Sequence, residues 1–141
     1  MKTLVIYDTN FGNTQKIAEA IAQGLREKGK AVSVLDLQKS DFDGVTNLIV
    51  GSPIYQWQPT QNMLNWLATL KPGQLFGIKA TTFDTRVKLF IHGDARNKIA
   101  SLLEKAGATI TGSPGAFFVK GKEGPLFDGE IEKAKKWGEQ G

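Results

Sequence analysis

The sequence predicts an α/β fold built on an open, doubly wound parallel sheet, and two observations lead to this prediction. Apolar runs of strand length alternate along the chain with stretches in which apolar residues recur at helical spacing. Strands that alternate with helices pair in parallel through right-handed crossovers, which places helices on both faces of the sheet. The chain has 141 residues, the usual size of one domain. We therefore expect three layers, a five-stranded sheet and a single domain spanning residues 1–141.

The chain opens with a strand and an amphipathic helix. Residues 4–7 form a continuous apolar run, which is typical of a strand covered on both faces. After a polar segment at residues 8–13, one helical face is marked by positions three and four residues apart: Thr14, Ile17, Ala18, Ile21, Ala22 and Leu25. Gly29 is expected just beyond the helix, where a left-handed backbone favours glycine.

The remaining elements follow from the same patterns. Expected strands lie at residues 31–37, 48–50 and 80–83, and a fifth strand lies at 109–111 and continues at 117–119. Expected helices lie at residues 59–70, 99–106 and 131–137. Residues 51–58 are expected to form a loop, and residues 87–91 either extend the fourth strand or form an irregular segment. In such sheets ligands bind beyond the carboxyl ends of the strands. The loops after the first, third and fourth strands are therefore the candidate sites.

Composition restricts the chemistry. The chain has no cysteine, which removes disulfides, thiol catalysis and thiolate metal sites. The single histidine, His92, is interpreted as a turn residue, and we predict neither catalytic residues nor a metal site. The net charge is +4 with basic residues spread along the whole chain, so no nucleic-acid partner is expected. No run is long enough for a membrane helix and no secretory signal is evident, so we expect a cytoplasmic protein.

A polar loop joins the first strand to its helix. It offers side-chain donors and one glycine: Thr9, Asn10, Gly12, Asn13 and Thr14. A helix start has unpaired backbone N–H groups and a partial positive charge, and both suit a phosphate. The loop is not a P-loop, because the G-x-x-x-x-G-K-[ST] pattern is absent. From these residues alone, a phosphate site and a capped polar turn both remain open.

The loop after the third strand is aromatic and uncharged. It contains Tyr55 and Trp57, and no charged residue occurs from residue 44 through residue 70. An aromatic side chain stacked on a planar ring gains about 1 kcal/mol beyond area burial. For both aromatic residues, capping of the core or a partner interface remains an alternative.

These two loops resemble the cofactor loops of the flavodoxin family. The first reads Thr9-Asn10-Phe11-Gly12-Asn13-Thr14, close to the family's phosphate loop [ST]-x-T-G-x-T, although Phe11 replaces a hydroxyl residue. The second reads Gly51-Ser52-Pro53-Ile54-Tyr55, close to the family's G-[ST]-P-x-[YW]. The resemblance implies a flavodoxin-like fold with strand order 2-1-3-4-5 and one FMN, bound non-covalently.

The resemblance also implies which residues hold FMN. The phosphate is expected at Thr9, Asn10, Phe11, Gly12, Asn13 and Thr14, and the ring at Ser52, Pro53, Ile54, Tyr55, Gln56 and Trp57. Tyr55 is favoured over Trp57 for stacking by its place in the motif. A third cofactor loop is expected by position only, because the family's G-x-G-D-x-x-Y pattern is missing: Thr82, Phe83, Asp84, Thr85 and Arg86. Asp84 and Arg86 either contact the flavin or pair with each other.

Electron transfer is the function that the resemblance implies. FMN in such a site passes electrons through semiquinone and hydroquinone states, and we expect a carrier that shuttles them between redox partners. The alternatives are a flavin reductase linked to NAD(P)H or a quinone, and a flavodoxin-shaped basic binding module without flavin. The lack of a G-x-G-x-x-G fingerprint favours the carrier over the reductase. The positive charge favours acidic partners, and a monomer is expected.

Overall fold

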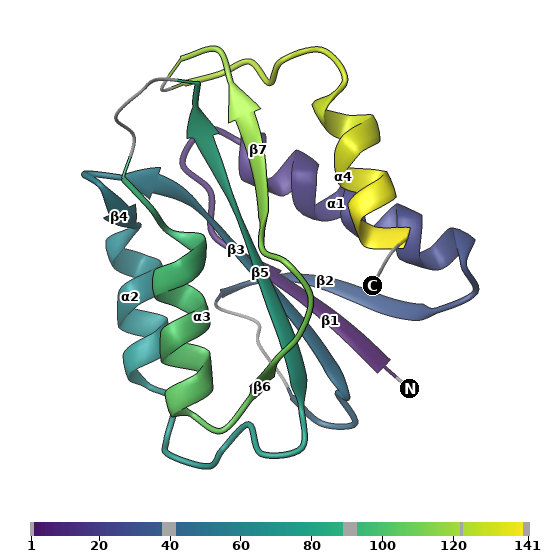
Figure 1. Cartoon of the computed structure of the whole chain (residues 1–141), viewed down its shortest axis with the longest axis vertical. Coiled ribbons are helices and arrows are strands. Elements are labelled where there is room, and N and C mark those ends of the chain that lie inside the picture. Colours follow the sequence, from purple (N-terminus) through teal and green to yellow (C-terminus); the bar gives the residue numbers. More distant parts are fainter. Residues whose placement is uncertain (1, 38–41, 89–92, 122, 140–141) are drawn as a thin grey trace.

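A parallel sheet forms the centre of the computed structural model, which describes residues 2–37, 42–88, 93–121 and 123–139 (Figure 1). Its strands are β1 (Lys2–Tyr7), β2 (Ala31–Asp36), β3 (Asn47–Tyr55), β4 (Gln58–Pro59), β5 (Lys79–Val87), β6 (Thr109–Ile110) and β7 (Gly115–Val119). The order is β2-β1-β3-β5-β6, with β4 paired to β3 and β7 paired to β5. This confirms the predicted order 2-1-3-4-5, because β5 is the fourth predicted strand and β6 and β7 are the two pieces of the fifth.

The predicted interruption of the fifth strand at residues 112–115 is present, except that Gly115 already belongs to β7. β6 pairs with the start of β5, where Lys79 lies opposite Thr109. β7 pairs with the later part of β5, from Phe83 opposite Gly115 onward. The second piece therefore ends at the carboxyl edge of the sheet, beside the end of β5.

Within the described residues, two helices cover each face of the sheet (Figure 1). α1 (Asn13–Glu27) and α4 (Glu130–Glu139) lie on one face, and α2 (Gln61–Ala68) and α3 (Arg96–Lys105) lie on the other. Gly29 follows α1 in the left-handed conformation, with φ of 79°, as predicted. No helix in this part of the chain is both long enough and apolar enough to cross a membrane.

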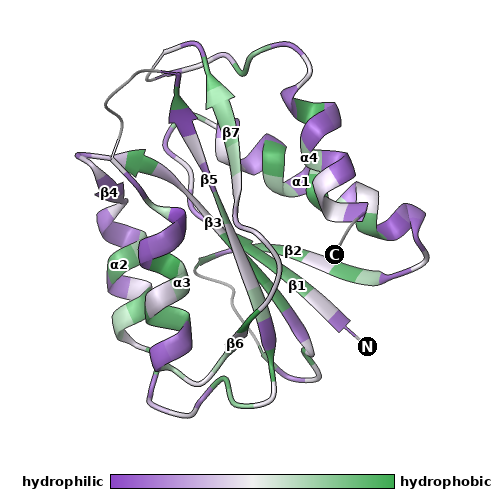
Figure 2. Cartoon of the chain, in the orientation of Figure 1, coloured by the Kyte–Doolittle hydropathy of each residue, from purple (hydrophilic) through white to green (hydrophobic). Residues whose placement is uncertain are grey.

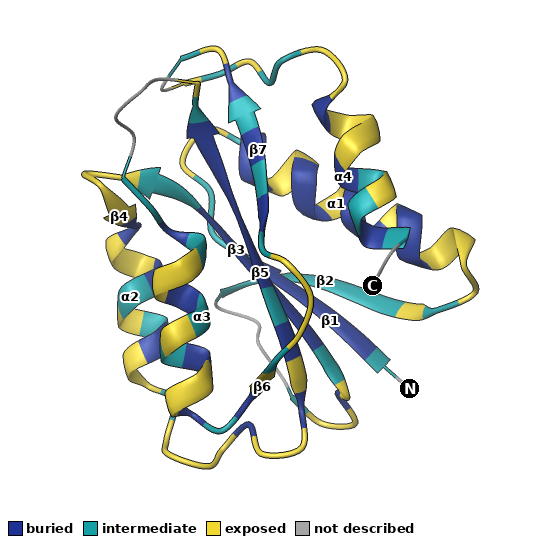
Figure 3. Ribbon diagram, viewed as in Figure 1, coloured by how far each residue is buried: buried dark blue, intermediate teal, exposed yellow. Residues whose placement is uncertain are grey.

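Each face of the sheet has its own apolar core. Leu4 and Ile6 belong to the core under α2 and α3, whereas Val5 belongs to the core under α1 and α4. Successive side chains of a strand point to opposite faces, so the apolar run of β1 supplies both cores. Hydrophobic residues and buried residues follow the central strands and the inner sides of the helices (Figures 2 and 3). The prediction of a strand covered on both faces is confirmed.

The loop predicted at residues 51–58 is wrong for most of its length. β3 continues through Tyr55 and turns back into β4 as an antiparallel hairpin. The turn residues Gln56 and Trp57 have φ of 50° and 73°, in the left-handed region that a two-residue hairpin of this hand requires. Neither is the Asn or Gly that such turns favour, so no local signal marked the hairpin. Tyr55 and Trp57 are consequently presented at a hairpin tip.

The fourth strand is longer than predicted, and the expected third cofactor loop at residues 82–86 is strand, not loop. β5 spans Lys79–Val87 because β3 on one side and β7 on the other supply backbone hydrogen bonds along its later half. Val87 extends the strand. Residues 89–92, which complete the segment left undecided from the sequence and include His92, lie outside the described residues.

Candidate functional site

A cavity of about 610 Å³ lies at the carboxyl edge of the sheet. Its walls come from the loop after β1, the start of α1, and the ends of β3, β5 and β7 with the residues that follow them, as expected for an open α/β sheet. The lining residues are Thr9, Asn10, Phe11, Asn13, Thr14, Pro53, Ile54, Tyr55, Gln56, Trp57, Thr85, Arg86, Val87, Lys88, Val119, Lys120, Gly121 and Phe127. The three predicted segments are thus brought together around one space.

The loop after β1 ends in a tight turn at the start of α1. Gly12 has φ of 90°, a conformation that glycine adopts without strain, and it directly precedes the first helical residue, Asn13. The backbone N–H of Gly12 donates to Oγ1 of Thr9 at 2.9 Å. The first backbone N–H groups of α1 have no partner inside the helix, and together with the helix dipole they suit an anion.

Two side chains predicted as phosphate donors hold the loop to other parts of the chain. Nδ2 of Asn13 donates to the carbonyl oxygen of Glu123 at 3.1 Å. The hydroxyls of Thr14 and Thr85 share a buried hydrogen bond of 2.8 Å. An anion in this loop would therefore be held mainly by backbone N–H groups.

Three aromatic side chains form an exposed rim around the cavity. Phe11, Tyr55 and Trp57 are 49%, 40% and 61% exposed. The hairpin tip is supported from behind, because the backbone N–H of Asp94 donates to the carbonyl of Trp57 at 3.1 Å. Gly93 packs so closely that a Cβ there would lie 2.4 Å from Cα of Trp57. Exposed aromatic faces on a fixed support are suited to binding a planar ring.

Arg86 lines the cavity and pairs with two carboxylates. Its Nε and Nη2 donate to the two carboxylate oxygens of Asp84 at 2.8 and 2.5 Å, and Nη2 also reaches Asp94 at 3.3 Å. Asp84 is fully buried and also accepts the backbone N–H groups of Ala95 and Arg96 at the start of α3. The hydrogen bond that Arg86 donates to Asp84 raises the pKa of Arg86 above its ordinary value, so the guanidinium stays charged. The sequence left an ion pair and a flavin contact open; the ion pair is present.

Some predicted site residues do not line the cavity: Gly12, Ser52, Thr82, Phe83 and Asp84. Phe83 is fully buried, and its ring lies edge-on to Phe117 and Trp137, with centroids 6.1 and 6.2 Å away. Oγ of Ser52 accepts the backbone N–H of Thr60 at 3.2 Å, which joins β3 to the start of α2. Ser52, Thr82, Phe83 and Asp84 are buried and serve the scaffold behind the lining residues.

Several lining residues were not predicted from the sequence: Val87, Lys88, Val119, Lys120, Gly121 and Phe127. The last four belong to the end of β7 and the segment after it. That segment reaches the loop after β1 through the Asn13–Glu123 hydrogen bond, which joins residues 110 positions apart. The one available signal was that the predicted strand at 117–119 ends at the same sheet edge.

A family model described as a flavodoxin domain matches residues 4–76, more than half of the chain. The chain belongs to the flavodoxin family. The match spans the loop after β1 and the hairpin of β3 and β4, which are the segments that build two walls of the cavity.

Relatives of this flavodoxin-family chain include whole flavodoxins and a larger oxidase. The coenzyme F420H(2) oxidase of Methanothermobacter marburgensis is 27% identical over 145 residues, which cover 96% of this chain and 35% of that protein. A flavodoxin of Aquifex aeolicus is 46% identical over 56 residues, 37% of this chain and 30% of that protein. The aligned segments thus span about a third of these two relatives. Oxidised flavodoxin 1 of Bacillus cereus has the same fold, with a TM-score of 0.81 at 20% identity over 98% of this chain and 95% of that one.

As a flavodoxin-family domain, the chain binds FMN, and the residues around the cavity fit this cofactor. The lining includes the first two residues of α1, Asn13 and Thr14, and backbone N–H groups at a helix start have no partner inside the helix and can bind a phosphate. The rim offers Tyr55 and Trp57 to the planar ring. Phe11 lacks the hydroxyl that the family's phosphate loop usually has there, but its backbone N–H remains.

Proposed function

We propose that this protein is an FMN-dependent electron carrier in which residues 1–141 act as one domain. The observation that supports this best is the cavity of about 610 Å³ at the carboxyl edge, with the start of α1 at one wall and the aromatic hairpin at another. Bound FMN supplies one-electron and two-electron redox chemistry. The first turn of α1 holds the phosphate, and Tyr55 or Trp57 covers one face of the ring and excludes water from it.

The lining chemistry supports a carrier. Among its described residues there is no carboxylate, and the one guanidinium, that of Arg86, is already paired with Asp84 and Asp94. A carrier needs no acid or base of its own, because its substrate is the electron. We therefore assign no catalytic residue and no metal.

The partners we propose are redox proteins that dock transiently at the cavity rim, with the protein acting as a monomer. The net charge of +4 favours acidic partners, because complementary charge raises association rates. Docking guided by charge must weaken at high ionic strength. An association rate that does not change with salt would contradict this choice of partner.

A second candidate is an electron-transfer module that works with an oxidase. The alignment to the F420H(2) oxidase covers 96% of this chain, so nearly all of its length has a counterpart within that larger protein. A flavin reductase linked to NAD(P)H or a quinone is the third candidate.

Flavin titration followed by turnover assays tests the proposal. Apoprotein is titrated with FMN and the quenching of flavin fluorescence is followed, for wild type, Trp57→Ala and Phe76→Ala. Phe76 is the matched control, since it is 86% exposed and lies outside the cavity lining. We expect one-to-one binding that Trp57→Ala weakens and Phe76→Ala leaves unchanged.

Turnover of the FMN-loaded protein separates the candidates. A carrier should be reduced by a chemical or protein donor but should not oxidise NAD(P)H with a quinone at steady state. Sustained NAD(P)H oxidation would favour the reductase, and transfer of electrons from reduced F420 through the bound FMN to a separate oxidase would favour the oxidase module. A folded protein without affinity for FMN would contradict all three and favour the flavin-free binding module.

A further inference from the structure

The phosphate of FMN meets a loop without positive side chains. A phosphate monoester carries about −1.5 to −2 charges at neutral pH. No lysine or arginine occurs from residue 8 through residue 15. Any cation that balances the phosphate must therefore come from another part of the fold.

Among the residues that the structure describes, the cavity lining contains three cations, all at the ends of β5 and β7: Arg86, Lys88 and Lys120. Arg86 is neutralised by the buried carboxylate of Asp84 and by Asp94. This leaves Lys88 and Lys120 as the positive charges of the lining among the described residues.

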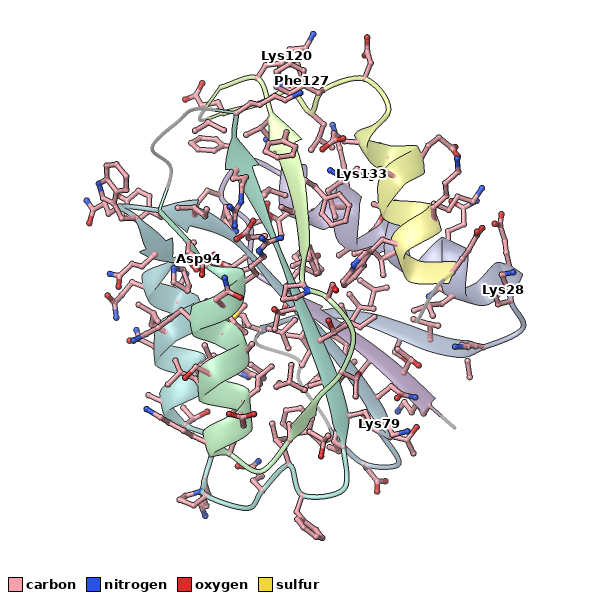
Figure 4. All side chains as sticks on the ribbon, in the orientation of Figure 1. Lys28, Lys79, Asp94, Lys120, Phe127 and Lys133 are labelled. Atoms are coloured by element: carbon pink, nitrogen blue, oxygen red, sulfur yellow. The ribbon has the colours of Figure 1, made fainter. Side chains whose placement is uncertain are left out.

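Aromatic rings hold these two lysines in place. Nζ of Lys88 lies 5.2 Å from the ring centroid of Phe127 and 5.5 Å from that of Phe118. Nζ of Lys120 lies 6.0 Å from the ring centroid of Phe127. Figure 4 shows Lys120 and Phe127 together at one end of the molecule. Such contacts position an ammonium group while its full charge remains.

Carboxylates do not cancel these charges within the described part of the chain. Neither lysine takes part in any of the ion pairs found there. The carboxylates of Glu123 and Asp128 belong to the same segment, but both residues are exposed and neither lines the cavity.

The segments that carry the two lysines are tied directly to the phosphate loop. Three residues before Lys88, Thr85 shares a hydrogen bond of 2.8 Å with Thr14. Three residues after Lys120, the carbonyl of Glu123 accepts Nδ2 of Asn13. The next residue, Gly124, packs so tightly that a Cβ there would lie 2.6 Å from Nδ2 of Asn13. Both contacts hold the lysine-bearing strand ends against the start of α1.

We propose that Lys88 and Lys120 form the cationic part of the FMN phosphate site, opposite the neutral loop after β1. This inference rests on the proposed placement of the phosphate at the start of α1. The lysines act on the phosphate through their charge across the cavity, so added salt should weaken their effect. They are binding residues and take no part in electron transfer.

Comparing FMN with riboflavin isolates the phosphate, because riboflavin has the same ring and ribityl chain without it. Dissociation constants for both flavins are measured by fluorescence quenching, at low and high salt, for wild type and for the double variant Lys88→Gln, Lys120→Gln. The matched control is Lys28→Gln, Lys79→Gln, which removes the same charge from exposed sites outside the lining (Figure 4). Circular dichroism confirms that each variant is folded.

We expect the cavity variant to lose about three- to tenfold in FMN affinity at low salt, less at high salt, and to bind riboflavin as wild type does. The control should change by less than about twofold for either flavin. Equal losses for FMN and riboflavin would place the lysines at the ring and overturn the inference, and so would unchanged FMN affinity. Wild-type protein that binds neither flavin would instead contradict the proposed function, and with it this inference.

Discussion

Replacing Arg86 by methionine removes the cation of the buried ion pair while keeping a long side chain in its place. Asp84, which is fully buried, then loses both hydrogen bonds from the guanidinium. Removing one partner of a buried pair typically costs about 3–5 kcal/mol, because the other charge stays out of water. The backbone N–H groups of Ala95 and Arg96 still donate to Asp84, so we expect the lower end, about 3 kcal/mol.

The reciprocal variant, Asp84→Asn, should cost less. Its amide oxygen can still accept the N–H groups of α3, and Arg86 keeps Asp94, which is 35% exposed, as a partner. We expect a loss of about 2 kcal/mol. The double variant, Arg86→Met with Asp84→Asn, should lose less free energy of unfolding than the two single variants added together. The difference should be about 1 kcal/mol or more, since neither charge is then left without its partner.

Urea unfolding of the apoprotein, followed by far-UV circular dichroism and extrapolated linearly to water, measures these losses. A loss below about 0.5 kcal/mol for Arg86→Met would match an ordinary surface substitution and refute the reasoning.

Three further predictions concern other parts of the scaffold. Thr60→Ala removes the side chain that accepts an N–H at the start of α2, so the free energy of unfolding should fall by about 1 kcal/mol; an unchanged thermal midpoint would contradict that role. The double change Gln56→Asn, Trp57→Gly supplies the residues that the left-handed turn favours. It should stabilise the apoprotein by about 1 kcal/mol, measured by urea unfolding, and weaken FMN binding, measured by flavin titration. Unchanged or lower stability would contradict the turn argument. Burial, and secondarily the charge of Asp36, raises the pKa of Tyr7 above its ordinary value of 10.0. The folded state therefore holds this proton more tightly than the unfolded state. The resulting contribution to the free energy of unfolding is fully present below the ordinary pKa and is lost as the pH rises through the pKa of the folded state. In Tyr7→Phe, the free energy of unfolding measured with urea should fall less steeply at alkaline pH than in wild type. An identical fall in both proteins would contradict this role of Tyr7.

The sequence alone determined the elements whose signals are local. The helical spacing from Thr14 to Leu25 indicates one buried face, because residues three and four apart on a helix share a face. The continuous apolar run at residues 4–7 indicates burial on both faces, because successive residues of a strand point to opposite faces. Gly29 was placed correctly because the left-handed residue after a helix favours glycine. The loop after β1 was recognisable because its chemistry, a strand followed by donors, a glycine and a helix start, lies within a few consecutive residues.

Tertiary structure decided where strands end and which side chains meet. β5 continues past residue 83 because β3 and β7 supply hydrogen bonds on both sides, and those partners are distant in the sequence. That extension leaves Arg86 at the cavity, above Phe83, which is buried in the core. Lys88 and Lys120 line the same cavity only because strands far apart in the sequence end side by side, and the Asn13–Glu123 contact spans 110 positions. Local patterns record which face of an element is buried, whereas the contacts between elements arise only when the chain folds.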